Sequence, residues 1–368
     1  MLLLAFLAPW PSPEMGWLLA CGLLFVGAAE LRVSLHRPVL WIFAWWCVGT
    51  SFWSAAPRAL EGSLAQVGCL WLGCCLAHRY SVVEILGLLS RMLALVVACH
   101  LVVVLFWPQL GMDSHGHWKG LTDHKNALAP LASLAVALGA LAPSTALGLP
   151  LRSLLLLGGG LLLVGADSAT PVLALAGMLV AAGLLKLFDR SRGKALGVAL
   201  LLALGTALNW RSVLAWVGRD PFLTGRVNVW RASLRYFADA PVVGHGFGQF
   251  ECAGFPGTLH PHHGLLLLLV STGLVGCLLF LVDFSWVGLQ AARRLSQGFE
   301  LSLGAPICFL VFWVILNQAE ILPPFLGLGF APILYAVASE KLVVGNQLMI
   351  GPTPHEAGHD GHLGQVDA

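Results

Sequence analysis

The stretch that decides the fold is residues 218–276, where three polar motifs interrupt long apolar runs. The motifs read GRDPFLTGRVNVW at 218–230, PVVGHGFG at 241–248 and HPHHG at 260–264. Arginine, histidine and tryptophan residues gather in these motifs, whereas the sequence on either side is nearly free of charge. We therefore expect the rest of the chain to hold this polar segment against a membrane.

The composition of the whole chain is that of a membrane protein. Its 368 residues are 58% hydrophobic and 10% charged, whereas a soluble domain carries about 25% charged residues. Such a chain has too little polar surface to face water, and it predicts an all-α, polytopic integral membrane protein. The formal net charge is only +2 and no basic run follows a nucleic-acid-binding pattern, so we expect no nucleic-acid partner.

The nine cysteines lie mostly inside apolar runs, and no pair of them has the spacing of metal ligands. Cysteine in such a context is most often a small apolar packing residue. Cys252 is the one cysteine in the polar segment, and its sequence neighbourhood suggests no partner.

Apolar runs predict about 11 to 12 transmembrane helices, because a helix needs about 20 mostly apolar residues to cross a bilayer. Several runs are shorter than this, so adjacent residues must complete them. The first seven residues are apolar but lack the basic start of a cleaved signal peptide. The candidate spans are 17–29, 39–52, 60–77, 82–107, 127–142, 151–165, 171–188, 195–210, 265–289, 303–317 and 324–338.

Lysine and arginine in the short loops predict the orientation of the chain. Alternate loops carry the basic residues, and we place these loops and a disordered tail at 343–368 in the cytoplasm. The other loops are then outside the cytoplasm: 54–58, 111–126, 166–170, 211–263 and 318–323. The predicted organisation is N-terminal transmembrane helices at 1–110, a second membrane domain at 111–342 that includes the outer loop 211–263, and the tail.

The longest outer loop carries more arginine than the positive-inside bias allows. Five arginines lie in it: Arg211, Arg219, Arg226, Arg231 and Arg235. Binding of an anionic group is a natural reason for this density. The alternative is that the arginines pair with nearby carboxylates or with lipid headgroups.

Part of this loop is expected to form a helix at the membrane surface. Thr224 is a suitable N-cap for a helix that runs to about Ala238, before Pro241. Arg226 and Trp230 are four residues apart and share a face, which Leu234 and Phe237 continue. A guanidinium at headgroup depth suits a phosphate or pyrophosphate, because it offers bidentate donors.

Two further features of the loop each have two interpretations. The glycine-rich run at 244–248 either lets backbone approach a ligand closely or turns the chain. His260, His262 and His263 stand at the mouth of the next span, where one histidine can serve as a general base near pH 7. A metal site is the alternative, but no carboxylate or cysteine stands at ligand spacing.

Three patterns follow one another in a defined order in this region. The first is GRD at 218–220 with LTGR at 223–226 and Trp230; the second is Pro241 with GHGFG at 244–248. The third is HHG at 262–264 followed by STGLVG at 271–276. Together they resemble the O-antigen ligase and polymerase superfamily of bacterial envelope glycan enzymes, and they are also similar to exopolysaccharide polymerases.

Upstream motifs agree with this resemblance and also lie in the predicted outer loops. GLTDHKN at 120–126, WSAAP at 53–57 and DSAT at 167–170 resemble motifs of the family's outer loops. The spacing from Gly273 picks out His262 as the family histidine. The family usually has asparagine after this histidine, whereas this chain has His263, which puts an amide role at that position in doubt.

The resemblance implies a membrane glycosyltransferase with a GT-C-like architecture and a glycan on undecaprenyl pyrophosphate as its donor. His262 would take the proton of an acceptor sugar hydroxyl, and Arg226 would stabilise the departing pyrophosphate. The reaction would invert the anomeric centre without a metal or other cofactor, on the periplasmic face of the bacterial inner membrane. Further contacts to the pyrophosphate or glycan would come from Arg219, Arg211, Lys125, Asn126, Trp230 and His245.

Other functions remain open at this stage. A ligase moves a finished glycan to lipid A–core, whereas a polymerase joins lipid-linked repeats, and both use the same donor chemistry. A transporter usually places ionisable residues mid-membrane and shows repeats. Here Arg91 and Asp283 are the exceptions in nearly charge-free spans, and we expect both to snorkel towards the cytoplasmic ends. A purely structural scaffold would leave the outer arginines and histidines unexplained.

Overall fold

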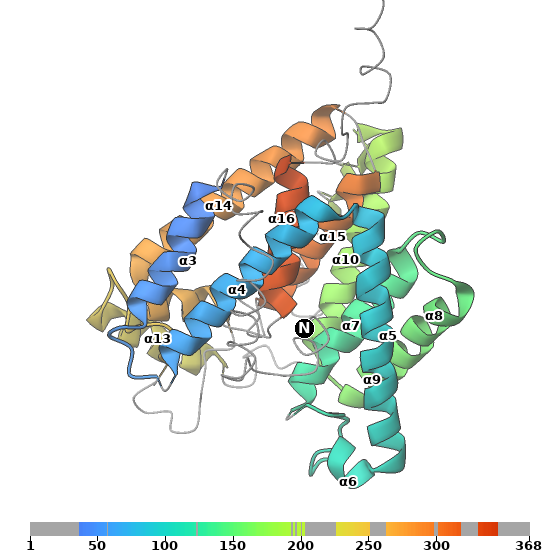
Figure 1. Ribbon diagram of the computed structural model, residues 1–368, viewed down its shortest axis with the longest axis horizontal. Coiled ribbons are helices and arrows are strands. Elements are labelled where there is room, and N and C mark those ends of the chain that lie inside the picture. Colours follow the sequence, from blue (N-terminus) through green and yellow to red (C-terminus); the bar gives the residue numbers. More distant parts are fainter. Residues whose placement is uncertain are drawn as a thin grey trace, which may run out of the picture.

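A computed structural model describes residues 37–56, 58–122, 124–192, 194–195, 197–199, 201–202, 226–250, 263–297, 301–317 and 330–344. Within these ranges every regular element is helical, apart from one isolated bridge between Met112 and Trp118 (Figure 1). Five of the described helical stretches are long and apolar enough to cross a membrane. The protein is therefore an all-α, multi-pass membrane protein, as its composition predicts.

The described helices follow the predicted spans closely. The spanning stretches are α4 (Ala59–Arg79), α5 (Val82–Phe106), the continuous α8 (Leu149–Ser153), η1 (Leu154–Gly158) and α9 (Gly159–Ala166), α10 (Ala169–Arg190) and α14 (Gly264–Gln297). Shorter helices complete the bundle: α3 (Pro38–Thr50), α6 (Pro108–Gly111), α7 (Lys125–Leu141), α13 (Arg226–Asp239), α15 (Leu301–Asn317) and α16 (Phe330–Val344). The span predicted at 17–29 and most of that at 195–210 lie outside the described residues.

The end predicted for the last span is wrong. Hydropathy ends the span at Ala338, but α16 continues through Ser339, Glu340 and Lys341 to Val344. These three polar residues are buried, and Arg37 contacts both the Ser339 hydroxyl at 2.7 Å and the Glu340 carboxylate at 3.4 Å. Tertiary partners therefore allow the helix to continue where its own sequence turns polar.

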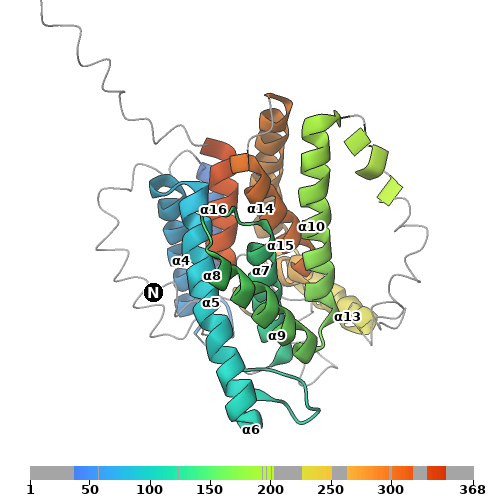
Figure 2. The same ribbon diagram turned by 90° about the vertical axis from the view of Figure 1, so that its right-hand side faces the viewer.

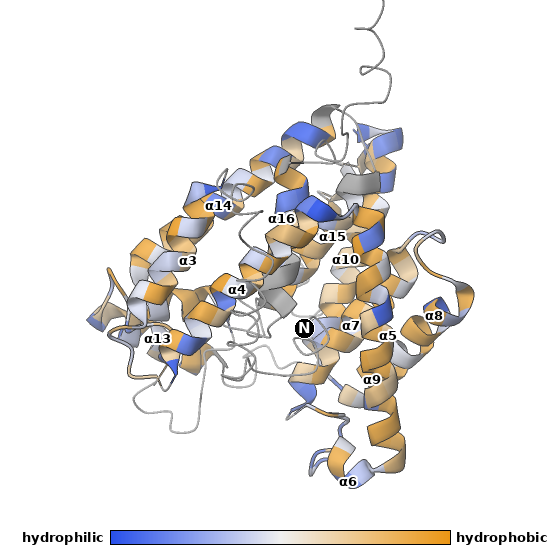
Figure 3. Ribbon diagram, viewed as in Figure 1, coloured by the Kyte–Doolittle hydropathy of each residue, from blue (hydrophilic) through white to orange (hydrophobic). Residues whose placement is uncertain are grey.

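The helices pack around two apolar cores. One core joins α5, α7, α9, α10 and α15, and the other joins α3, α4, α14 and α16. Hydrophobic residues cover the middle of the helices and hydrophilic residues gather towards their ends (Figure 3). Large apolar side chains also point outward, such as Val164 at 80% exposure and Leu278 at 57%. Lipid is the surrounding that accommodates such side chains.

The predicted outer and inner loops separate to opposite ends of the bundle. α6 and α13 lie towards one end in both views, together with the loop after α3 (Figures 1 and 2). The last turns of α10, α14 and α16 lie towards the other end (Figure 1). This separation agrees with the alternation of basic loops, and the side that each end faces across the membrane remains a prediction.

Asp283 does not snorkel as expected. Its side chain is 3% exposed, and Arg37 bonds to it in a bidentate manner, with Nη2 to Oδ2 at 2.6 Å and Nε to Oδ1 at 3.3 Å. The Tyr335 hydroxyl donates to the same carboxylate at 2.7 Å. Buried charges are tolerated when they are paired and hydrogen-bonded, and this pair joins the start of α3 to α14 and α16.

Candidate functional site

The long helix α14 is broken at Gly273, near its predicted outer end. Gly273 has φ 67° and ψ −170°, a conformation that is essentially restricted to glycine. A Cβ at this position would also collide with the backbone carbonyl of Val242. The break frees backbone groups of α14 that would otherwise bond within the helix.

The glycine-rich loop after α13 satisfies these freed groups. Four backbone hydrogen bonds cross between the two segments: His245 N to Val270 O at 2.8 Å, Gly246 N to Ser271 O at 2.9 Å, Leu274 N to Pro241 O at 2.9 Å, and Val275 N to Val242 O at 3.2 Å. Because an unsatisfied backbone group is costly at membrane depth, the loop and the broken helix need each other. The close backbone approach that the glycines permit is thus to α14.

The WSAAP motif docks on the other side of the same loop. The Trp53 indole N–H donates to Gly244 O at 3.2 Å, and the Ser54 hydroxyl donates to Phe247 O at 2.7 Å. An added Cβ on Gly246 would come within 2.5 Å of the Ser54 Cα, so glycine is needed at this contact. Three motifs that are far apart in the sequence therefore meet at the break in α14; Pro57 lies outside the described residues.

Helix α13 packs against α14 through a face next to the one expected to lie along the membrane surface. Val229 and Ser233 are buried, and Phe237 packs beside them, whereas Leu234 is 49% exposed. The buried Ser233 hydroxyl donates to Val229 O at 2.6 Å, so its burial leaves no unsatisfied donor. Within the face expected to lie along the membrane surface, Leu234 is thus open, whereas Phe237 packs against this cluster. The proposed N-cap, Thr224, lies outside the described residues.

Trp230 and His263 meet at the start of α14. Their rings are perpendicular, with centroids 5.5 Å apart. The Nδ1 atom of His263 accepts the Leu266 N–H at 3.4 Å, which places His263 at the N-cap of α14. Burial lowers the pKa of His263, so the ring is neutral at pH 7. With Nδ1 as an acceptor, Nε2 carries the proton and is available as a donor.

His245 links the glycine-rich loop to α13. Its ring stacks on Tyr236 with centroids 3.7 Å apart and planes 6° from parallel. Its Nε2 atom donates to Tyr236 O at 2.7 Å. Both interactions hold the loop against the helix, which is a positioning role that the sequence did not indicate.

A second polar cluster surrounds the turn between α9 and α10. Lys125 Nζ donates to Asp167 O at 3.4 Å, and the Ser168 hydroxyl donates to Asn126 Oδ1 at 3.3 Å. Asp167 has a left-handed φ of 48°, so this turn depends on contacts that hold it. The predicted substrate residues Lys125 and Asn126 supply those contacts.

The same cluster contains a carboxylate–imidazole pair that sequence reasoning missed. Asp113 Oδ2 lies 3.1 Å from His117 Nδ1, and Asp113 also accepts the backbone N–H groups of His115 and His117. Partial burial alone would raise the pKa of Asp113, but these hydrogen bonds outweigh it and lower the pKa to about 2. The signal in the sequence was an aspartate four residues before a histidine in a predicted outer loop.

Comparison with known families agrees with the motifs that meet at α14. Residues 153–281 match the family model described as O-antigen ligase. The match covers about a third of the chain, and over this range the chain is similar to the O-antigen ligase family. The matched range contains α13, the glycine-rich loop and the first part of α14 with its break. Members of the family are glycosyltransferase-like enzymes that act on lipid-linked glycans. A search of curated proteins found no match to this chain.

The structure brings together some of the residues expected for an O-antigen ligase site. Trp230 and His245 gather with His263 around α13 and the outer end of α14. Lys125 and Asn126 form the separate cluster, which lies towards the same end of the bundle (Figure 1). Arg226 is the first residue of α13, and its side chain is outside the described part. His262, Arg219 and Arg211 also lie outside the described residues.

Among the described residues, no group of three or more histidine, cysteine, aspartate or glutamate side chains could hold a metal ion. His260 and His262 lie outside the described residues. The metal interpretation of the histidine motif therefore has to be tested by experiment.

Proposed function

We propose that this protein is a glycosyltransferase of the bacterial envelope. It transfers a glycan from undecaprenyl pyrophosphate to an acceptor sugar hydroxyl at the periplasmic face of the inner membrane. The observation that carries this proposal is the contact between Trp230 and His263 at the start of α14. That contact joins the helix that Arg226 begins to the histidine motif, within the range that is similar to the O-antigen ligase family.

The donor pyrophosphate would bind where the first turns of α13 and α14 converge. Arg226 stands four residues before Trp230, so its Cα lies about 6 Å along the helix axis from that of Trp230. The positive end of the α14 dipole favours an anion at the same place. Arg226, with Arg219 and Arg211, would supply bidentate donors and stabilise the charge that develops on the leaving pyrophosphate.

The general base would be His262, which directly precedes the N-cap residue of α14. Consecutive Cα atoms are about 3.8 Å apart, so His262 enters the site within one residue of the Trp230–His263 contact. His262 would accept the proton of the acceptor hydroxyl while the hydroxyl oxygen attacks the anomeric carbon. The bond from that carbon to the pyrophosphate breaks and the configuration inverts. The cationic side chains carry the charge stabilisation, and no metal is required.

The other residues predicted to contact the substrate would bind the glycan or hold the site in place. Trp230 would stack on a sugar ring, with His263 Nε2 as a neighbouring donor. The cluster of Lys125 and Asn126, at the same end of the bundle, would contact the glycan or the lipid-linked phosphate. His245 would act mainly by holding the loop. These residues all belong to the membrane domain proposed at 111–342.

The acceptor distinguishes a ligase from a polymerase. A bacterial strain in which the gene is deleted tests both possibilities. Loss of glycan on lipid A–core while long lipid-linked chains remain identifies a ligase. Accumulation of single lipid-linked repeats identifies a polymerase. The wild-type gene should restore the surface glycan, and a His262→Ala gene expressed to the same level should not. A deletion strain with unchanged surface and lipid-linked glycans would overturn the proposal.

A further inference from the structure

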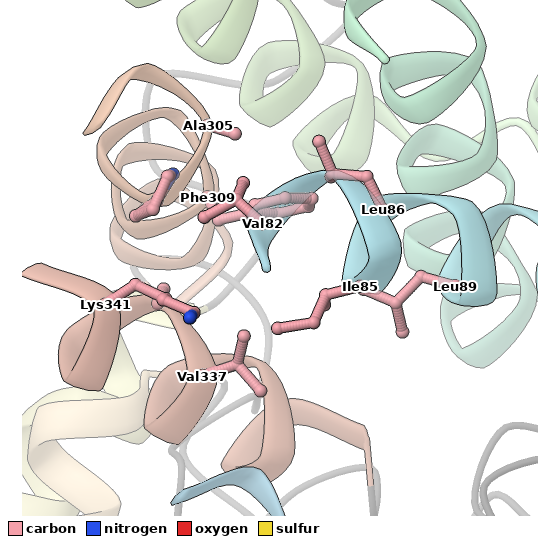
Figure 4. A pocket seen from close by; sticks show the side chains of 10 residues that line it. Val82, Ile85, Leu86, Leu89, Ala305, Phe309, Val337 and Lys341 are labelled. Carbon is pink, nitrogen blue, oxygen red and sulfur yellow. The ribbon is translucent and has the colours of Figure 1, made fainter. Parts of the chain in front are cut away.

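A partly open apolar cavity lies between α5, α15 and α16 (Figure 4). Its walls are hydrophobic side chains from all three helices, and among the described residues Lys341 is the one charged residue that lines it. The lining residues include Val82, Ile85, Leu89, Phe309, Val337 and Lys341. The cavity follows α5 from Val82 to Leu89, about 10 Å along the helix axis.

Lys341 is placed unusually for a lysine at a membrane surface. The residue is only 5% exposed, and its ammonium points into the space between α16 and α5 (Figure 4). Within the described part of the chain, no hydrogen bond or ion pair joins this ammonium to another residue. Glu84 and Glu340 attract this ammonium through space without bonding to it directly, so an anion at this position would stabilise the buried charge further.

The nearby carboxylates are engaged elsewhere. Glu340 bonds to Arg37 and to His78, and it is not among the residues that line the cavity. Glu84 closes a capping box with Ser81 at the exposed start of α5. Neither carboxylate is within ion-pair distance of the Lys341 ammonium, which leaves it available for a ligand.

An apolar cavity with one cation at its edge fits an amphiphilic anion. The start of α5 and the last turns of α16, which line the cavity, lie at the opposite end of the bundle from α13 (Figure 1), where the basic loops predict the cytoplasmic side. The cytoplasmic leaflet holds anionic lipids, and basic pockets between helices on that side bind their headgroups. We propose that this cavity takes an acyl chain of an anionic phospholipid whose phosphate bonds to Lys341. The site is separate from the one proposed for glycan transfer.

The test compares binding of two lipids to the full-length protein. The protein, purified in a neutral detergent and stripped of lipid, is titrated with phosphatidylglycerol or phosphatidylcholine and followed by native mass spectrometry. The wild type should prefer phosphatidylglycerol, and Lys341→Met should lower that preference about fivefold, as expected for one lysine–lipid contact. Lys341→Arg should keep it. Lys194→Met is the matched control, because Lys194 is exposed and outside the cavity.

A second variant tests the apolar part of the site. Ala338→Phe adds a ring to the cavity wall and keeps the lysine, so it should weaken binding of both lipids, with melting temperature as the check on folding. A Lys341→Met protein with the same lipid preference as Lys194→Met would overturn the proposal. Displacement of phosphatidylglycerol by an equal concentration of undecaprenyl phosphate would also overturn it, and would identify a donor-lipid site.

Discussion

At the scale of single residues, the candidate site depends on which groups carry charge and which carry protons. His263 is neutral and caps α14 through Nδ1, so its free nitrogen is a donor. The adjacent His262 is therefore the better candidate for the base. Arg226 stands at the first turn of α13, where a fixed cation would meet the donor phosphate.

The arginine prediction concerns geometry as well as charge. We expect Arg226→Lys to lose nearly as much kcat/KM as Arg226→Ala, about 100-fold, because lysine is a point charge without bidentate donors. The measurement is the initial rate with a purified lipid-linked donor. Arg235→Lys, an exposed arginine on the same helix, is the control. Full activity in Arg226→Lys would mean that a general positive field is sufficient.

The two adjacent histidines should respond differently to substitution. His262→Ala should lower kcat by about 100-fold or more while donor binding stays nearly unchanged, as expected for a general base. His263→Asn should be tolerated, because asparagine is a favoured N-cap and can accept the same Leu266 N–H. His263→Ala should cost about 1 kcal/mol of stability through loss of the cap.

Turnover and donor binding of these three variants are measured with and without a chelator. Retained turnover in His262→Ala would remove the base assignment. Loss of activity on chelation would favour the metal interpretation of the histidine motif.

The His263 ring also predicts a dependence of stability on pH. Its pKa in the folded protein is lower than the ordinary value near 6.5, because the ring is partly buried. The unfolded chain therefore binds a proton first as pH falls, and the wild type should lose stability progressively below about pH 6.5. His263→Asn should lack this component. Melting curves in detergent between pH 7.5 and about pH 5 compare the two proteins, and identical pH profiles would contradict the expectation.

At the scale of elements, a broken helix and a loop form one unit. The loop after α13 bonds to both halves of α14, and Trp53 and Ser54 hold the loop from the other side. α13 is placed by this unit, because its end continues into the loop and its buried face packs on α14. The orientation of Trp230 towards His263 therefore depends on the break at Gly273.

Gly273→Ala should destabilise this unit. Alanine is strained at φ 67° and ψ −170°, which costs about 1–3 kcal/mol, and its Cβ would also collide with Val242. We expect a lower melting temperature and loss of glycan transfer. Gly288→Ala is the matched control, since an added Cβ there meets nothing within 4 Å and the residue lies in the same helix. Equal melting temperatures and activities for the two variants would refute the role of the break.

At the scale of the whole molecule, two apolar cores support one polar end that carries both candidate clusters. The buried Arg37–Asp283 pair joins helices from different parts of the chain around one of these cores. The opposite end holds the basic loops and the cavity beside Lys341. The two ends should therefore meet different membrane surfaces.

Thiol labelling tests this orientation. Cysteine replaces Ala238, which is exposed on α13, in a background without the native cysteines. It should react with an impermeant reagent in intact spheroplasts. Ser233 is unsuitable because its side chain is fully buried. Cysteine at Arg190, exposed at the other end of the bundle, should react only after lysis. The reverse pattern would invert the predicted topology.

The sequence by itself determined the membrane fold, most helix limits and the order of the motifs. Apolar length and the position of charges decide these features, and both are local properties of the chain. It also assigned Trp230 and the histidine motif to one substrate site, but it did not predict the contact between the Trp230 and His263 rings.

Only the tertiary structure decided which partners the polar groups have. Hydropathy could not show that Arg37 meets Asp283, 246 residues away, so it predicted snorkelling and ended α16 too early. Helical periodicity grouped Arg226, Trp230, Leu234 and Phe237 on one surface face, but it did not indicate that Val229 and Ser233 pack against α14. The glycine motifs indicated an unusual backbone conformation, but only the fold showed that the glycine-rich loop bonds to the break in α14. In a membrane, backbone and charged groups must find partners within the protein, and those partners can come from anywhere in the chain.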